Sequence, residues 1–257
     1  TAADQSDNQQ TLNFTKDVLQ PLEGNALLLS VGDTTILGPW YVQHAEGFRP
    51  DVSVIAVPLL SSAWYVDNLR RRESNVSIPF DRFDPASGAD IGKLVDANIG
   101  RRPVYYVGVI SDRFPPNYDE LRVGFARRLV PKGQAPDPFA YIASHLDELK
   151  QLQFPTKAYG PETWEAWEAT QYGAVAFNIA NALERTDVTA AEQWYRRAIE
   201  LNPSNPGTYQ NLALLIAPQG RVPEVADLLK RFLTLAPNDP QAPQMREFLI
   251  SHGYSPP

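Results

Sequence analysis

Residues that could contact a ligand gather in one stretch near the amino terminus of this sequence. Gly32 and Asp33 follow a short apolar run, at the place where parallel α/β sheets bind their ligands. Asp33 could contact a ligand or a cation there. Its carboxylate could instead accept hydrogen bonds from the free N–H groups that begin the next helix. We expect this second, structural role for Asp33 or Thr34, with Gly32 supplying the sharp turn after the strand.

Aromatic side chains follow in two adjacent pairs, Trp40 with Tyr41 and Trp64 with Tyr65. Flat aromatic rings can stack on a sugar ring, which makes all four candidates for a carbohydrate contact. Their helical spacing also suits packing in a hydrophobic core, the commoner use of such residues. His44, at the end of the same helical stripe, is expected to be a packed or hydrogen-bonded histidine at the edge of the core.

The fingerprints of common cofactor and catalytic sites are absent from this sequence. Gly32 stands alone where a dinucleotide site needs three spaced glycines, and no P-loop or G-x-S-x-G motif occurs. The sequence has no cysteine, and its three histidines lie far apart without the H-x-x-x-H spacing of a zinc site. We therefore expect no cofactor, no metal and no catalytic residue.

Composition and charge describe an acidic globular chain. The 257 residues carry a net charge of -7 and are 43% hydrophobic, which suits one large domain or two modest ones. Such a charge argues against a nucleic-acid partner, and the short basic runs at 70–72 and 101–102 are expected on the solvated surface. No apolar run is long enough to span a membrane, and no secretory signal is recognised. The lack of cysteine suits an extracytoplasmic protein, and Thr1 is expected to follow a removed segment or a fragment boundary.

The elements that must position these residues alternate in the first half of the chain. Apolar runs predict buried strands at residues 26–31, 51–58 and 103–110, with a fourth strand at 122–130. Helical patterns occupy residues 9–22, 64–72 and the stretch after Gly32, where Gly47 ends a stripe made by Leu37, Trp40, Tyr41 and His44. Residues 1–133 are therefore predicted to form an α/β, Rossmann-like domain. Its sheet should be mostly parallel with flanking helices, and loops are expected at 114–120 and 130–138.

The second half is helical and repetitive. Pro203 and Pro237 lie 34 residues apart, which is the tetratricopeptide period. The positions expected to pack two repeats are Ala191, Tyr195, Ala198, Pro203, Tyr209, Leu212, Ala213, Gly220, Leu229 and Pro237. Residues 161–257 are thus predicted to form a tetratricopeptide helical array, closed by a capping helix near 240–253. Residues 134–160 are predicted to be a linker or connecting helix. Helices predicted near 139–152 and 162–172 would either add layers to the array or join it to the α/β half.

The segment "ALLLSVGDTTILGPWYVQHAEGFRPDVSVI" resembles a known protein family. It is similar to the soluble carboxyl-terminal region of bacterial membrane proteins related to protein O-mannosyltransferases, a region of unknown function in the GT-C glycosyltransferase superfamily. The residues that match are Gly32, Asp33, Trp40, Tyr41, Gln43, Glu46, Gly47, Arg49, Pro50, Asp51, Val52, Leu59, Leu60, Trp64, Tyr65, Arg102, Pro103, Val104, Tyr105, Arg128, Leu129, Val130 and Pro131. The similarity spans residues 12–133, and tetratricopeptide repeats also follow in such proteins. Thr35 stands where family members often carry a second acid, which argues against a cation site built on paired acids.

The resemblance implies a parent glycosyltransferase with many membrane helices, a catalytic acid in an early extracytoplasmic loop and a lipid-linked sugar donor. This chain would then be a non-catalytic extracytoplasmic domain, anchored by the membrane-embedded part of its parent, that binds an acceptor or a partner. The contacts expected for that ligand or acceptor are Gly32, Asp33, Trp40, Tyr41, Gln43, Arg49, Trp64 and Tyr65. A protein or peptide would bind the tetratricopeptide helices. Two alternatives stay open: a tetratricopeptide scaffold whose α/β half is structural, and an independent enzyme with a crevice at Gly32 and Asp33.

Overall fold

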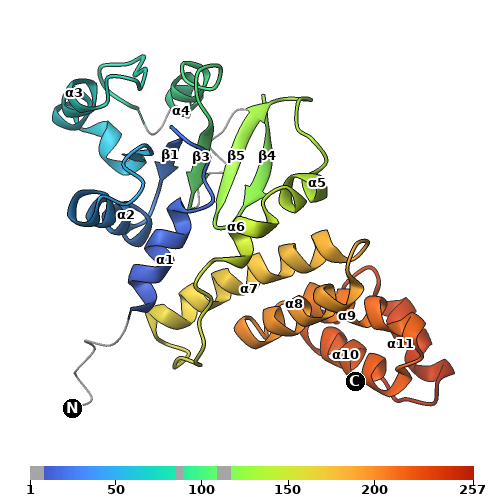
Figure 1. Cartoon of the computed structure of the whole chain (residues 1–257). Helices are drawn as coiled ribbons and strands as arrows, with labels where there is room; N and C mark the ends of the chain where they lie inside the picture. Colours follow the sequence, from blue (N-terminus) through green and yellow to red (C-terminus); the bar gives the residue numbers. More distant parts are fainter. Residues whose placement is uncertain (1–8, 85–88, 109–116) are drawn as a thin grey trace, which may run out of the picture. The chain divides into compact units, whose positions relative to one another are not determined.

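The computed structural model describes residues 9–84, 89–108 and 117–257 and divides the chain into two compact units (Figure 1). The first unit, within residues 1–153, is mixed α/β, and the second, residues 154–257, is helical. The predicted linker at 134–160 holds two short helices of the first unit, and the domain limits predicted at 133 and 161 stay a prediction. No helix among the described residues is long and apolar enough to cross a membrane.

The first unit is built on a five-stranded sheet with the order β2-β1-β3-β5-β4. The strands are β1 (Leu27–Ser30), β2 (Ser53–Ala56), β3 (Val104–Val107), β4 (Tyr118–Val123) and β5 (Ala126–Pro131). β1 runs parallel to β2 and β3, whereas β5 is antiparallel to both β3 and β4. The runs at 26–31 and 51–58 are confirmed as buried strands. The prediction of a mostly parallel sheet is wrong, because half of these pairings are antiparallel.

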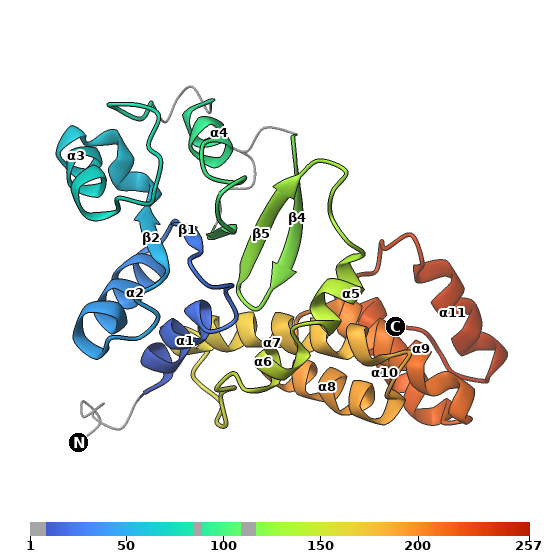
Figure 2. The same cartoon turned by 45° about the horizontal axis from the view of Figure 1, so that its top comes forward.

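The antiparallel part is a hairpin that the sequence pattern concealed (Figure 2). Residues 122–130, predicted as one strand, are divided between β4 and β5 by a turn in which Gly124 takes a φ of 54°. The loop predicted at 114–120 ends inside β4, and the loop predicted at 130–138 begins inside β5. Residues 109–116, which include the end of the strand predicted at 103–110, lie outside the described residues.

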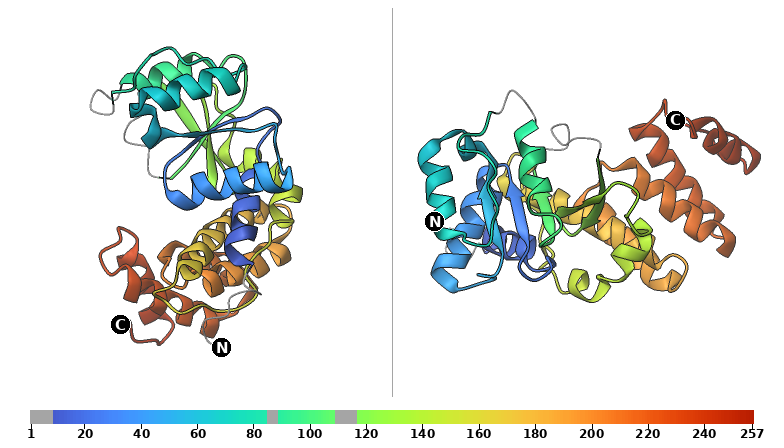
Figure 3. Two further views of the ribbon diagram at one scale, coloured as in Figure 1. Left: turned by 90° about the vertical axis from the view of Figure 1, so that its left-hand side faces the viewer. Right: turned by 90° about the horizontal axis from the view of Figure 1, so that it is seen from above.

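Helices cover both faces of this sheet. They are α1 (Gln10–Leu19), α2 (Asp33–Glu46), the 3-10 helix η1 (Val57–Ser61), α3 (Ala63–Arg72), α4 (Ala89–Asp96), α5 (Pro138–Ala143) and α6 (Leu146–Lys150). Figure 3 shows α3 and α4 on the opposite side of the sheet from α1 and α2. Leu27 and Leu29 of β1 share a buried core with Leu69 of α3 and Leu94 of α4. The helices predicted at 9–22 and 64–72 are confirmed, and the one predicted at 139–152 is split into α5 and α6.

The buried face of α2 differs from the predicted stripe. Leu37 and Tyr41, both expected in the core, are each 58% exposed. The cause is Gly38, whose missing side chain lets α2 approach α1 closely: a Cβ at Gly38 would lie 2.4 Å from the Thr15 hydroxyl. The residues that α2 buries instead are Thr35, Ile36, Pro39 and Val42. The predicted helix end is confirmed, since Gly47 has the left-handed φ of 64° that favours glycine.

The start of α2 is fixed by Thr35 and not by Asp33. The Thr35 hydroxyl donates to the carbonyl oxygen of Gly32 at 3.1 Å and accepts from the Ser30 hydroxyl at 2.9 Å. Asp33 is the exposed first residue of the helix, and no described side chain caps the helix start at Gly32. The capping role predicted for Asp33 or Thr34 is therefore wrong. Asp33 contributes its charge, which is favourable at the amino end of a helix.

The second unit is a row of helices in which each packs on the next along the chain. Its elements are α7 (Trp164–Leu183), α8 (Val188–Leu201), α9 (Pro206–Ile216), the 3-10 helix η3 (Ala217–Gln219), α10 (Val222–Leu235) and α11 (Ala242–Ser251). Pro203 and Pro237 are exposed just beyond α8 and α10, and Gly220 has a φ of 73° in the turn before α10. The predicted packing positions that are buried are Ala191, Tyr195, Ala198, Tyr209, Leu212, Ala213 and Leu229.

The close approach of two strand ends makes a prediction about Gly108. This residue follows β3 with a φ of 92°, and a Cβ there would lie 2.2 Å from the carbonyl oxygen of Val31, which follows β1. We expect Gly108→Ala to lower the free energy of unfolding by about 2 kcal/mol or more, measured by urea denaturation. Gly100→Ala is the matched control, since a Cβ at Gly100 meets no atom within 4 Å. Equal stability of the two variants would contradict the packing described for these strand ends.

Candidate functional site

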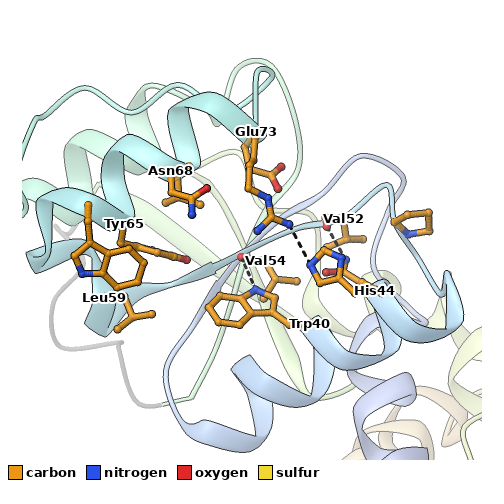
Figure 4. Close-up of a pocket in the computed structure, with 13 residues that line it drawn as sticks. Trp40, His44, Val52, Val54, Leu59, Tyr65, Asn68 and Glu73 are labelled. Carbon is orange, nitrogen blue, oxygen red and sulfur yellow. Dashed lines mark hydrogen bonds between the residues drawn. The ribbon is translucent and has the colours of Figure 1, made fainter.

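A pocket of about 370 Å³ lies at the outer edge of the sheet, between α2 and α3 (Figure 4). Side chains of α2 form one wall, α3 and the residue after it form the other, and the edge strand β2 lies between them. The lining residues begin with Trp40 and end with Glu73. This volume lies at the lower end of the range for small-molecule sites in proteins.

Three aromatic residues give the pocket its apolar part. The indole N–H of Trp40 donates to the carbonyl oxygen of Val54 at 3.2 Å, which fixes the plane of the ring. The Tyr65 ring lies 6.4 Å from that of Trp40 and 5.7 Å from that of Trp64, measured between centroids. Trp64 is 62% exposed, so its ring is open to solvent at the mouth. The apolar part of the pocket therefore extends from the Trp40 ring, which is held by a hydrogen bond, to the Trp64 ring, which solvent can reach.

Side chains hold the backbone groups that β2 directs away from the sheet. The Gln43 amide donates to the carbonyl oxygen of Val52 at 2.7 Å, and the Tyr65 hydroxyl accepts from the N–H of Ala56 at 2.9 Å. Burial raises the pKa of Tyr65 to about 12, which keeps this hydroxyl neutral. Together with the bond from Trp40 to Val54, these contacts cover an edge that would otherwise invite pairing with another strand.

Polar groups line the side of the pocket nearest the end of α3. The Glu73 carboxylate accepts from the Ser53 hydroxyl at 2.6 Å, and a guanidinium nitrogen of Arg72 lies 3.2 Å from His44 Nε2. Asn68 also lines the pocket, and its side chain has no hydrogen-bond partner among the described residues. His44 is exposed at this rim, so the prediction of a histidine at the core edge is wrong, although its hydrogen bond fits the expectation.

Arg49 is a structural residue and not a lining one. It adopts a left-handed φ of 48°, and its guanidinium donates to the carbonyl oxygens of Leu19 at 2.8 Å and Glu23 at 3.1 Å. It also pairs with the Asp51 carboxylate at 2.9 Å, and that carboxylate accepts from the N–H of Asn25 at 3.1 Å. These contacts define an Arg-Pro-Asp turn, residues 49–51, which connects the segment before β1 to the segment before β2.

Arg102 corrects the prediction that residues 101–102 lie on the solvated surface. Arg101 is exposed, but Arg102 is only 5% exposed. Its guanidinium donates to the carbonyl oxygens of Asn25 at 2.8 Å and Ala26 at 3.0 Å, and to the Ser53 hydroxyl at 3.1 Å. Desolvation lowers its pKa, and the nearby Glu73 carboxylate opposes that shift. The run at 70–72 is exposed, as predicted.

The structure brings together half of the residues predicted to contact a ligand. Those that line the pocket are Trp40, Gln43, Trp64 and Tyr65, and those that do not are Gly32, Asp33, Tyr41 and Arg49. The sequence prediction missed His44, Asn68, Arg72 and Glu73 as lining residues, since no motif joins them and only tertiary packing does. No group of three or more metal-ligating residues occurs in the described part of the chain.

Comparison with known proteins relates the chain to glycosyltransferases. Residues 11–83 match the family model described as TMEM260-associated domain 2, and every lining residue of the pocket falls within them. The chain is 24% identical over 208 residues to "Protein O-mannosyl-transferase tmem260" of Dictyostelium discoideum, covering 77% of this chain and 25% of that protein. It is 24% identical over 247 residues to "Protein O-mannosyl-transferase TMEM260" of Mus musculus, covering 86% of this chain and 35% of that protein.

The chain therefore contains a domain related to those of protein O-mannosyl-transferases. It spans between a quarter and about a third of the length of these relatives, which come from two eukaryotes. Membrane anchoring of the full-length protein is consistent with this relationship. The bacterial origin implied by the sequence resemblance stays a prediction.

The Arg-Pro-Asp turn predicts a pH-dependent stability. Hydrogen bonds from Arg49 hold the pKa of Asp51 at about 2, below the value of 3.8 that is ordinary for aspartate. A lowered folded-state pKa means that the contribution is present above about pH 4 and is lost as the pH falls towards 2. We expect Asp51→Asn to be less stable than the parent by about 1 kcal/mol or less at pH 6, since the carboxylate is partly exposed, and the difference to vanish near pH 2.

Urea unfolding at a series of pH values measures this difference. Asp67→Asn is the control, because Asp67 is an exposed carboxylate 4.0 Å from Arg70 and takes no part in the turn. A difference between Asp51→Asn and the parent that stays constant from pH 6 to about pH 2 would show that ionised Asp51 does not stabilise the fold.

Proposed function

We propose that this chain is a non-catalytic, extracytoplasmic part of a membrane protein related to protein O-mannosyl-transferases, and that it binds an acceptor or a partner. One observation carries the proposal: the whole lining of the pocket lies within residues 11–83, the part that matches the TMEM260-associated domain. The part of the chain that matches the family model is thus also the part that forms a pocket of small-molecule size.

The lining of the pocket favours binding over catalysis. Glycoside hydrolysis usually employs two carboxyl groups that flank the bond to be cleaved. Among the described residues that line this pocket, Glu73 is the one carboxylate, and it is engaged by the Ser53 hydroxyl. The rest of the lining consists of aromatic rings, amides, aliphatic groups and the guanidinium of Arg72, which suit recognition of a ligand. Gly32 and Asp33, the crevice of the alternative enzyme hypothesis, do not line it.

The second unit supports a separate contact with a protein or peptide. We propose that it is a tetratricopeptide array, because Pro203 and Pro237 follow α8 and α10 with a spacing of 34 residues. A network of four charges joins these two helices: Arg196 and Arg221 each pair with both Glu192 and Glu224. Such arrays bind partners on extended surfaces of stacked helices. The membrane-embedded part of the same protein is the other partner proposed.

The proposal predicts how a pocket variant affects transfer by the full-length protein. Trp64→Ala should raise the KM for the acceptor by about tenfold and leave kcat unchanged, because it removes a binding contact without touching the reacting groups.

The purified 257-residue chain alone should transfer no mannose from a lipid-linked donor above a heat-denatured control. A fall in kcat at unchanged KM, or turnover by the isolated chain that Asp33→Ala abolishes, would contradict the proposal.

A further inference from the structure

We propose that the pocket between α2 and α3 binds one pyranose ring of a neutral sugar. This inference rests on the proposed function, and it adds the chemical class of the ligand. A pyranose has an apolar face of C–H groups and a rim of hydroxyls that both donate and accept hydrogen bonds. The pocket presents the matching combination, with flat aromatic rings on one side and planar polar groups on the other (Figure 4).

The aromatic part is ordered before any ligand arrives. The bond from Trp40 to the Val54 carbonyl and the contact with Tyr65 hold the Trp40 ring in place within the pocket. Trp64 is exposed at the mouth and packs edge-on against Tyr65, with an interplanar angle of 72°. A sugar ring that stacks on these residues therefore displaces water from aromatic surface without a large ordering cost.

The polar part retains hydrogen-bonding capacity that the described protein groups do not use. The Asn68 amide has no partner among the described residues, and it can both donate and accept. The carbonyl oxygen of Val54 accepts from Trp40 and therefore faces away from β1. Because the N–H and the carbonyl of one strand residue point to the same side, the Val54 N–H also faces away from β1. No described side chain accepts a hydrogen bond from it. These two groups suit the hydroxyls of a sugar.

The charges of the lining favour a neutral ligand. Arg72 and Glu73 are adjacent in sequence and both line the pocket, so a phosphate or carboxylate would meet Glu73 and a cation would meet Arg72. An extended peptide would pair with the outer edge of β2. Side chains of Trp40, Gln43 and Tyr65 already engage three outward backbone groups along β2 and the residue before it, which leaves too few for a ladder with another strand. A sugar requires neither a net charge nor a free strand edge.

The test titrates the whole chain with methyl α-D-mannopyranoside, methyl α-D-glucopyranoside, methyl β-D-galactopyranoside and inorganic phosphate, followed by calorimetry. We expect saturable binding of at least one hexoside with a Kd in the millimolar range, and weaker or no binding of phosphate. Trp64→Ala and Asn68→Ala should each raise that Kd by about tenfold while the melting temperature stays within about 2 °C of the parent. Trp164→Ala, which removes a tryptophan that is 51% exposed on α7, is the control and should bind like the parent.

Two results would overturn the inference: no saturable binding of any of the three hexosides, or a loss of binding in Trp164→Ala equal to that in Trp64→Ala. The outcome is separable from that of the proposed function. Sugar binding without any effect of Trp64→Ala on the acceptor KM would refute the proposed function and keep this inference. A raised acceptor KM in Trp64→Ala without any sugar binding would refute this inference and keep the proposed function.

Discussion

The guanidinium of Arg102 lies buried where the three parallel strands begin, and its hydrogen bonds tie them together. Arg102 precedes β3, donates to the carbonyl oxygens that lead into β1, and donates to the hydroxyl of Ser53, the first residue of β2. A buried guanidinium must satisfy its donors, so these bonds fix where each strand starts. Ser53 in turn donates to Glu73, which places the residue after α3 at the wall of the pocket.

The pocket divides its residues between holding the fold and meeting a ligand. The outer edge of β2 is protected from pairing with another strand by hydrogen bonds to the side chains of Trp40, Gln43 and Tyr65. Trp64 and Asn68 have no such task and remain available. Ser53 of the same strand accepts from Arg102 and donates to Glu73, so β2 positions both the aromatic part and the polar part of the pocket.

Local signals in the sequence predicted β1, β2, α3 and the Gly47 helix end, because apolar runs, helical periodicity and a left-handed glycine depend on near neighbours. The orientation of α2 was not predictable, since it depends on the contact of Gly38 with Thr15 of another helix. The burial of Arg102 was concealed by its charged neighbour Arg101. Half of the candidate contacts reached the pocket, whereas Asn68 and Glu73 enter it only through tertiary packing and carried no motif.

The most direct test of this account is a two-dimensional 1H–15N NMR titration of the chain with a binding methyl hexoside. The five tryptophans give five indole N–H signals, which single Trp→Phe variants assign. The account predicts that the signals of Trp40 and Trp64 move with a common saturation curve, while those of Trp164, Trp167 and Trp194 do not. Unchanged signals of Trp40 and Trp64 at concentrations that saturate binding, or movement confined to the other three, would contradict it.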